Sequence, residues 1–360
     1  MGGFSALVQL IVMIIVGYYF ILKLKNDSSG ERDAAQEAKG EAEKLNALRH
    51  IRLNEPMTEL ARPGRIADII GQDDGVKALR AALWGANPQH VLIYGPPGVG
   101  KTAAARIVME DIKRSPDTPF EKNAPFIEAD AAIMRCDERG FADPLIGSVH
   151  DPIYQGAGAY GLAGVPQPKA GAVTKAHGGI LFLDEIGELP NEQINKLLKV
   201  LEDRRVILES SYYSRKNRKI PVYIRDIFDN GLPADFRLIG ATTRKPEEIP
   251  EAVRSRCVEV YFNPLSRADI VRIITEAALR CGAAIDNGVR EIIADYSSNG
   301  REAVKLLQSA VNVAKMEGRP VVSVSDAKWV VEAGHCKKNK EIPLKPNEKI
   351  TKISFVKPEG

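Results

Sequence analysis

The chain has 360 residues, a formal net charge of +3 and a hydrophobic content of 44%. This length allows one large or two modest globular domains. The 50 basic and 47 acidic residues nearly balance, which argues against bulk nucleic-acid binding. The four cysteines show no CxxC spacing, which argues against a zinc site or a disulfide framework and fits a reducing compartment.

An uncharged apolar stretch, "FSALVQLIVMIIVGYYFIL", lies at the N-terminus. Its about 19 residues would extend roughly 28 Å as a helix, close to the thickness of a bilayer core. Lys23 and Lys25 follow directly, which predicts a transmembrane anchor over residues 1–25 and a cytoplasmic remainder. The alternative is a cleaved signal peptide, but a positive leading region and a cleavage site are absent. The predicted localisation is the cell membrane, as a single-pass protein.

The rest of the chain divides by composition. Residues 26–57 are polar and predict an exposed helical linker. Residues 58–263 alternate helical patterns with four apolar runs, "HVLIYG", "GGILFLDEIGEL", "FRLIGATT" and "CVEVYF", which predicts an α/β domain with a mainly parallel sheet. Residues 264–336 predict four helices and no further strand, and residues 337–360 form a basic, proline-punctuated linker.

A glycine-rich segment, "GPPGVGKT", lies between the first apolar run and a helical pattern. It fits the phosphate-binding pattern G-x-x-x-x-G-K-[ST], in which backbone N–H groups surround the phosphates. The lysine would reach the terminal phosphates, and the threonine hydroxyl would bind Mg²⁺. The predicted nucleotide-binding residues are Gly95, Pro96, Pro97, Gly98, Val99, Gly100, Lys101 and Thr102.

An acidic pair, Asp184 and Glu185, ends the second apolar run. Asp184 at the carboxyl end of a strand can hold the metal, and Glu185 can polarise an attacking water as a general base. The alternative is a strand that ends in surface acids. Together with the glycine loop, the pair favours ATP hydrolysis with Mg²⁺ as the cofactor. The guanine-reading pattern N-K-x-D does not occur in the sequence.

Residues at three further places in the chain are candidates for the same site. Thr242 and Thr243 end the third apolar run, and one of them could orient the water, although both could be ordinary strand residues. Arg254 and Arg256 precede the fourth run, where an arginine could complete the site of a neighbouring subunit or form a surface salt bridge. Arg301 lies at the start of one of the helices predicted within residues 264–336, and it could reach the phosphates.

Together these motifs resemble the AAA+ ATPases over residues 58–336. The segment "DIIGQ", which contains Ile70 and Gly71, is similar to the adenine-side motif of that family. Longer stretches, such as "DERGFADPLIGSVHDP" and "NGLPADFRLIGATTR", resemble the ATPase module of B-type Lon proteases. The implied fold is a P-loop α/β domain with a parallel sheet and a small C-terminal helical lid, preceded by one transmembrane helix.

The resemblance also implies roles for single residues. It makes Thr243 the sensor-1 residue, favours Arg256 over Arg254 as the arginine finger and makes Arg301 the sensor-2 residue. The segment "PLIGSV" falls where the family has a pore loop, so Leu145 and Ile146 would grip substrate, with packing beneath a loop as the alternative. A basic stretch over residues 212–225 would form a second loop near the pore. The implied assembly is a homo-oligomer, a hexamer, that acts on unfolded or damaged proteins.

The sequence departs from the Lon pattern in one respect: no P-x-D-G-[PS]-S-A stretch with a peptidase serine occurs in it. The expectation is therefore a motor that hydrolyses ATP but cuts no peptide bond alone, with the peptidase domain missing or on a separate chain. One alternative is a DNA-remodelling motor, such as a branch-migration helicase or a clamp loader, which only the basic stretch supports. Another is a transcription-activator ATPase, whose "GAFTGA" loop is absent. No nucleic-acid partner is expected.

Overall fold

The protein is described from a computed structural model, which covers residues 13, 40–50, 53–134, 143–150, 165–211, 213–217 and 220–339. The chain divides into two compact units, Met1–Glu55 and Pro56–Gly360. In the first unit, residues 40–50 form an exposed helix. The expected basic linker over residues 337–360 lies outside the described residues from position 340 onward.

The expected membrane anchor over residues 1–25 lies, apart from Met13, outside the described residues. Within the described ranges, no helix combines the length and the apolar character that a membrane crossing requires. The helix at residues 40–50 is charged and much shorter than the about 20 apolar residues of a membrane span. This finding contradicts the prediction that the protein is localised to the cell membrane through a single transmembrane helix.

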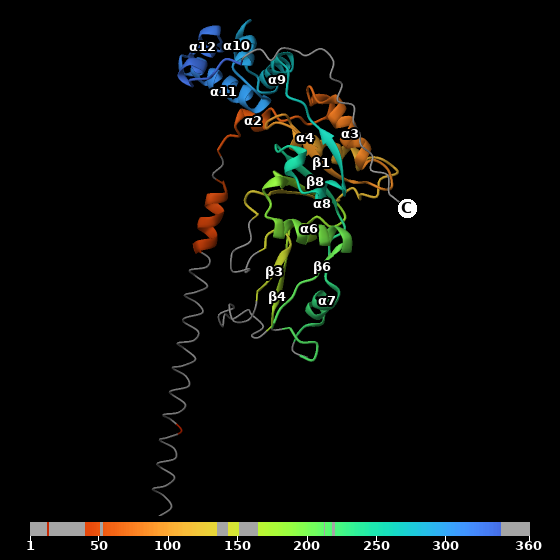
Figure 1. The fold of residues 1–360 in the computed structure, drawn as a ribbon. Helices are drawn as coiled ribbons and strands as arrows, with labels where there is room; N and C mark the ends of the chain where they lie inside the picture. Colours follow the sequence, from red (N-terminus) through yellow and green to blue (C-terminus); the bar gives the residue numbers. More distant parts are fainter. Residues whose placement is uncertain are drawn as a thin grey trace, which may run out of the picture. The chain divides into compact units, whose positions relative to one another are not determined.

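A five-stranded sheet forms the centre of the second unit (Figure 1), in the order β2-β5-β8-β1-β9. Its strands are β1 (His90–Tyr94), β2 (Phe126–Asp130), β5 (Ile180–Asp184), β8 (Arg237–Thr242) and β9 (Cys257–Tyr261). Every neighbouring pair in the sheet is parallel. All five strands therefore end at one edge, and the loops that follow them meet there.

The sheet is buried on both faces. In β5, Leu181 and Leu183 face one hydrophobic cluster, and Ile180 and Phe182 face the other. The first cluster includes helices α6 (Asn191–Asp203) and α7 (Val222–Asn230), and the second includes α3 (Asp73–Leu83) and α4 (Lys101–Ile112). A strand covered on both faces needs apolar residues at successive positions, which explains its continuous apolar run.

Short elements connect these layers. Two small antiparallel pairs form between β3 (Gly147–His150) and β4 (Gln167–Ala170), and between β6 (Arg205–Val206) and β7 (Leu232–Pro233). The remaining short helices are α2 (Met57–Leu60), η1 (Ile66–Asp68), α5 (Ala172–Lys175), η2 (Ile186–Glu188), η3 (Pro246–Glu248) and α8 (Glu251–Arg254).

Four helices form a domain with its own core, which we call the helical domain: α9 (Arg267–Arg280), α10 (Val289–Asp295), α11 (Gly300–Met316) and α12 (Val324–Ala333). Ser266 and Ser323 begin α9 and α12 with reciprocal capping boxes, and the Asn299 side chain caps α11. The expectation of no further strand was wrong, because β10 (Ala284–Ile285) and β11 (Val321–Val322) pair in parallel. Two residues each are too few for a periodic pattern.

Candidate nucleotide-binding and hydrolysis site

The glycine-rich loop connects the end of β1 to the start of α4. Gly98 and Gly100 have φ values of 72° and 96°, in the left-handed region that favours glycine. Gly100 is the N-cap of α4, and Lys101 is the first residue of that helix. The loop therefore presents backbone N–H groups at a helix N-terminus, the arrangement that binds phosphate.

The Lys101 side chain lies inside this loop and is only 7% exposed. Its Nζ donates hydrogen bonds to the carbonyl oxygens of Gly95, at 2.7 Å, and Pro96, at 3.1 Å. Burial lowers the pKa of Lys101, while the negative charges of Glu185 and Asp184 raise it. The ammonium group is thus held between the loop and the acidic pair.

The acidic pair lies where β5 ends. Burial raises the pKa of the half-buried Asp184 carboxyl, and the neighbouring charge of Glu185 adds to this effect. The Glu185 backbone N–H donates to Asp184 Oδ1 at 3.2 Å. Glu185 has a φ of 49°, a left-handed conformation that costs a residue with a side chain roughly 1–2 kcal/mol. Asp130, which the sequence analysis missed, is aligned with Asp184 on the neighbouring strand β2.

Thr243, which follows β8, contacts the acidic pair directly. Both its backbone N–H and its Oγ1 donate to Glu185 Oε2 at 3.1 Å. Thr242 is fully buried, and its Oγ1 accepts from the backbone of Arg244 at 3.1 Å. The structure therefore brings Thr243, rather than Thr242, to the carboxylate expected to act as the base.

The two candidate arginines of "AVRSRC" are both paired within the chain. Arg254 Nε donates to Glu259 Oε1 at 2.8 Å. Arg256 forms an ion pair with Glu202 on α6 and donates to the carbonyl oxygen of Ala252 at 2.9 Å. Both thus form the salt bridges that the sequence left open as the alternative. A role toward a neighbouring subunit stays a prediction.

The N-terminus of α11 lies against the glycine-rich loop. A Cβ atom added to Gly98 would lie 2.5 Å from Asn299 Oδ1, and one added to Gly300 would lie 3.4 Å from the Gly98 carbonyl oxygen. Arg301 is close enough that its positive charge lowers the pKa of Lys101. The helical domain therefore reaches the loop through Asn299, a contact that no motif in the sequence indicated.

The expected adenine-side segment packs between the sheet and the helical domain. Ile70 is 8% exposed, and Gly71, with a φ of 74°, lies where a Cβ atom would meet Asp269 at 2.9 Å. The buried Gln72 side chain holds the backbone of Asn263 by two hydrogen bonds, of 2.7 Å to its carbonyl oxygen and 2.9 Å from its N–H. This amide clamp fixes the segment after β9 and was not predicted.

The structure places the expected substrate-gripping residues in the interior of the second unit. Leu145 is fully buried and Ile146 is 8% exposed, and both belong to the hydrophobic cluster on one face of the sheet. Both backbone N–H groups donate to Asp143 Oδ1, at 3.1 Å and 2.8 Å. The alternative, core packing beneath a loop, is what the structure has. Of the basic stretch 212–225, positions 212, 218 and 219 lie outside the described residues.

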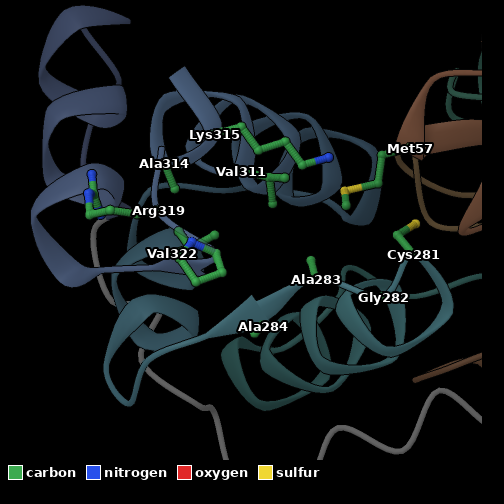
Figure 2. Close-up of a pocket in the computed structure, with 11 residues that line it drawn as sticks. Met57, Cys281, Gly282, Ala283, Ala284, Val311, Ala314, Lys315, Arg319 and Val322 are labelled. Atoms are coloured by element: carbon green, nitrogen blue, oxygen red, sulfur yellow. The ribbon is translucent and has the colours of Figure 1, made fainter. Parts of the chain in front are cut away.

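A pocket within the second unit is unrelated to this site. Figure 2 shows that side chains from α11 and the β10–β11 region surround it, together with Met57. Its only charged lining residues are Lys315 and Arg319, and the latter is paired with Asp326. None of the predicted site residues lines this pocket.

Comparisons with known proteins fit this geometry. A family model described as "Magnesium chelatase, subunit ChlI" matches residues 65–220. The chain is 54% identical to Lon protease 2 of Bacillus subtilis (strain 168) over 92% of the chain, but spans only 60% of that relative's length.

Solved structures share the fold. The Thermotoga maritima RuvB Holliday junction branch migration motor matches with a TM-score of 0.51 and 21% identity, covering 76% of this chain and 73% of that chain. Brucella abortus NtrX, in complex with ADP, matches with a TM-score of 0.52 and 20% identity, covering 86% of this chain and 62% of that chain. Identities this low show the fold alone, an AAA+ P-loop α/β domain with a parallel sheet.

Proposed function

The chain contains a Lon-type AAA+ ATPase module, and on this premise we propose that it is the ATP-driven motor of a Lon-type protease, which unfolds and translocates protein substrates. One observation carries the proposal. The loops after β1, β5 and β8 meet at one edge of the sheet, where Lys101, the acidic pair and Thr243 come together. A terminal phosphate, its metal and an attacking water would be held by groups of these types.

Oxygen donors at this edge suit Mg²⁺. The Thr102 hydroxyl and the Asp184 carboxylate are hard ligands of the kind that this ion prefers beside a substrate phosphate. Bound there, the ion would neutralise charge on the phosphate oxygens. In the proposed site Glu185 accepts a proton from the attacking water, Thr243 holds the Glu185 carboxylate in place, and Lys101 binds the terminal phosphates.

We place the second half of the site on a neighbouring subunit. The proposed assembly is a homo-oligomeric ring, a hexamer, in which Arg256 of one chain reaches the phosphates bound by the next. Its partially exposed guanidinium group is held by Glu202 and by the Ala252 carbonyl oxygen of α8, so a phosphate with greater charge could compete for it. Arg301 at the start of α11 would contact the phosphates within its own chain.

Mixing two inactive variants tests this arrangement. Arg256→Ala chains keep a pocket but offer no finger, and Lys101→Ala chains offer a finger but have no pocket. We expect each variant alone to be nearly inactive and a 1:1 mixture to recover about a quarter of the wild-type ATPase rate, the share of interfaces that pair both intact halves. Absence of recovery in a mixture shown to co-assemble would place Arg256 in its own chain's site.

The class of substrate is tested by stimulation of the ATPase. We expect unfolded casein to raise the ATP hydrolysis rate severalfold, because a motor that pulls on protein couples substrate binding to its cycle. Folded casein-sized proteins and single- or double-stranded DNA should leave the rate unchanged. Stimulation by DNA, with a steep loss of the effect at higher salt, would instead support the DNA-remodelling alternative.

A further inference from the structure

A partly buried carboxylate lies one strand away from the phosphate loop. Glu259 is in the edge strand β9, and its side chain is only 15% exposed. It accepts hydrogen bonds from Arg254 Nε and the Tyr261 hydroxyl, both at 2.8 Å, and from the Tyr94 hydroxyl at 3.3 Å. Burial alone would raise the pKa of Glu259, but the bonds from Arg254 and Tyr261 hold it below its ordinary value.

The aromatic partners of Glu259 lead to the nucleotide site. The rings of Tyr94 and Tyr261 stack with centroids 5.2 Å apart and an interplanar angle of 19°. Tyr94 is 3% exposed and immediately precedes Gly95, the first glycine of the phosphate loop. Burial raises the pKa of Tyr94 and raises that of Tyr261 to about 12. Both hydroxyls are therefore protonated donors near neutral pH.

Arg254, the charged partner of Glu259, lies close in sequence to the candidate arginine finger, Arg256. Arg254 is the last residue of α8, and the Arg256 guanidinium donates to the Ala252 carbonyl oxygen of the same helix. A helix of four residues is not stable by itself, so contacts from outside must fix its position. The Arg254–Glu259 pair is such a contact, and it joins α8 to the strand beside the phosphate loop.

We propose that Glu259 is a positioning residue for the inter-subunit step: by holding Arg254, it fixes α8 so that Arg256 is directed at the nucleotide of the neighbouring chain. The inference rests on the proposed function, because it requires that Arg256 act across a subunit interface. In this proposal Glu259 acts only through its contact with Arg254. A displacement of the finger by about 1 Å is enough to reduce the rate strongly.

A donor assay isolates this role. Lys101→Ala chains supply only a finger, so a second substitution in them cannot act through their own pocket. Mixed with Arg256→Ala chains, Lys101→Ala/Glu259→Ala chains should restore ATPase at a rate about tenfold lower than Lys101→Ala chains do. Lys101→Ala/Glu251→Gln chains, altered at an exposed residue of α8, should restore as much as the reference.

Three further measurements separate positioning from loss of folding. The Arg254→Ala substitution in the same donor should reproduce the Glu259→Ala effect, and the two together should cost no more than either alone. In chains with an intact pocket, Glu259→Ala should lower kcat while the KM for ATP changes by less than about twofold. Glu259→Gln, which keeps a carbonyl acceptor, should restore part of the lost rate.

The outcomes separate a failure of this inference from a failure of the proposed function. If the reference mixture recovers activity and the Glu259→Ala donor restores as much as the Glu251→Gln donor, Glu259 has no positioning role. Additive losses from Arg254→Ala and Glu259→Ala would also overturn the inference. If the co-assembled reference mixture recovers nothing, the trans-acting finger fails and this inference fails with it.

Discussion

Lys101→Ala should abolish nucleotide binding, and we expect the largest loss of affinity from this substitution. The Lys101 ammonium group lies inside the loop, 2.7 Å from the Gly95 carbonyl oxygen, in a 7% exposed position. A charge-assisted contact to phosphate in so sheltered a place should be worth roughly 100-fold or more in affinity. Titration with a fluorescent ATP analogue measures the loss directly.

The control for this variant is a lysine elsewhere in the same unit. Lys305→Ala removes an exposed positive charge from α11, downstream of Arg301, and should leave nucleotide affinity unchanged. Because Lys101 also bonds the loop carbonyls, thermal unfolding should be recorded for both variants. A folded Lys101→Ala chain that binds the analogue within about threefold of wild type would show that the loop does not hold phosphate.

Glu185→Gln should separate binding from hydrolysis. The amide cannot accept a proton from water, so the rate should fall about 100-fold or more, the usual contribution of a general base. Nucleotide affinity should be retained, because Asp184 and Lys101 are untouched. The glutamine can also still accept the two hydrogen bonds that Thr243 donates at 3.1 Å.

Phosphate release and analogue binding, measured on one preparation, provide both values. The control is Glu192→Gln, which neutralises an exposed carboxylate at the start of α6, a few residues after β5. It should behave as wild type in both assays. Normal phosphate release by the Glu185→Gln chain would assign the base to another residue. Asp130, aligned with Asp184 on β2, would then be the first to substitute.

The sequence predicted those elements whose pattern comes from burial on both sides. β1 and β5 appear as unbroken apolar runs because the sheet is covered on both faces, and the motif residues follow them directly. Strand β2 was missed because Glu128 and Asp130 leave its sequence without a continuous apolar run, whereas the other edge strand, β9, carries a single acidic residue and was predicted.

The candidate site was predictable only where a local motif exists. The glycine loop and the acidic pair are short motifs next to apolar runs, so their place at the ends of two strands could be predicted. The contacts of Asn299 with Gly98 and of Gln72 with Asn263 join segments far apart in the chain, which no spacing rule reports. The burial of Leu145 was not predictable, because a resemblance aligns positions in sequence without determining which side chains are buried.

The contact between Asn299 and the phosphate loop has a thermodynamic consequence. Asn299 of the helical domain lies against the loop that would surround the phosphates, at a glycine where even one added carbon would lie 2.5 Å from Asn299 Oδ1. Two binding events that both depend on this contact are coupled reciprocally: each changes the affinity of the other by the same factor. If pulling on the helical domain separates Asn299 from Gly98 and thereby weakens nucleotide binding, nucleotide binding must resist that pull by the same free energy. A bound nucleotide would then hold the helical domain against the load, and the load would favour release of the nucleotide.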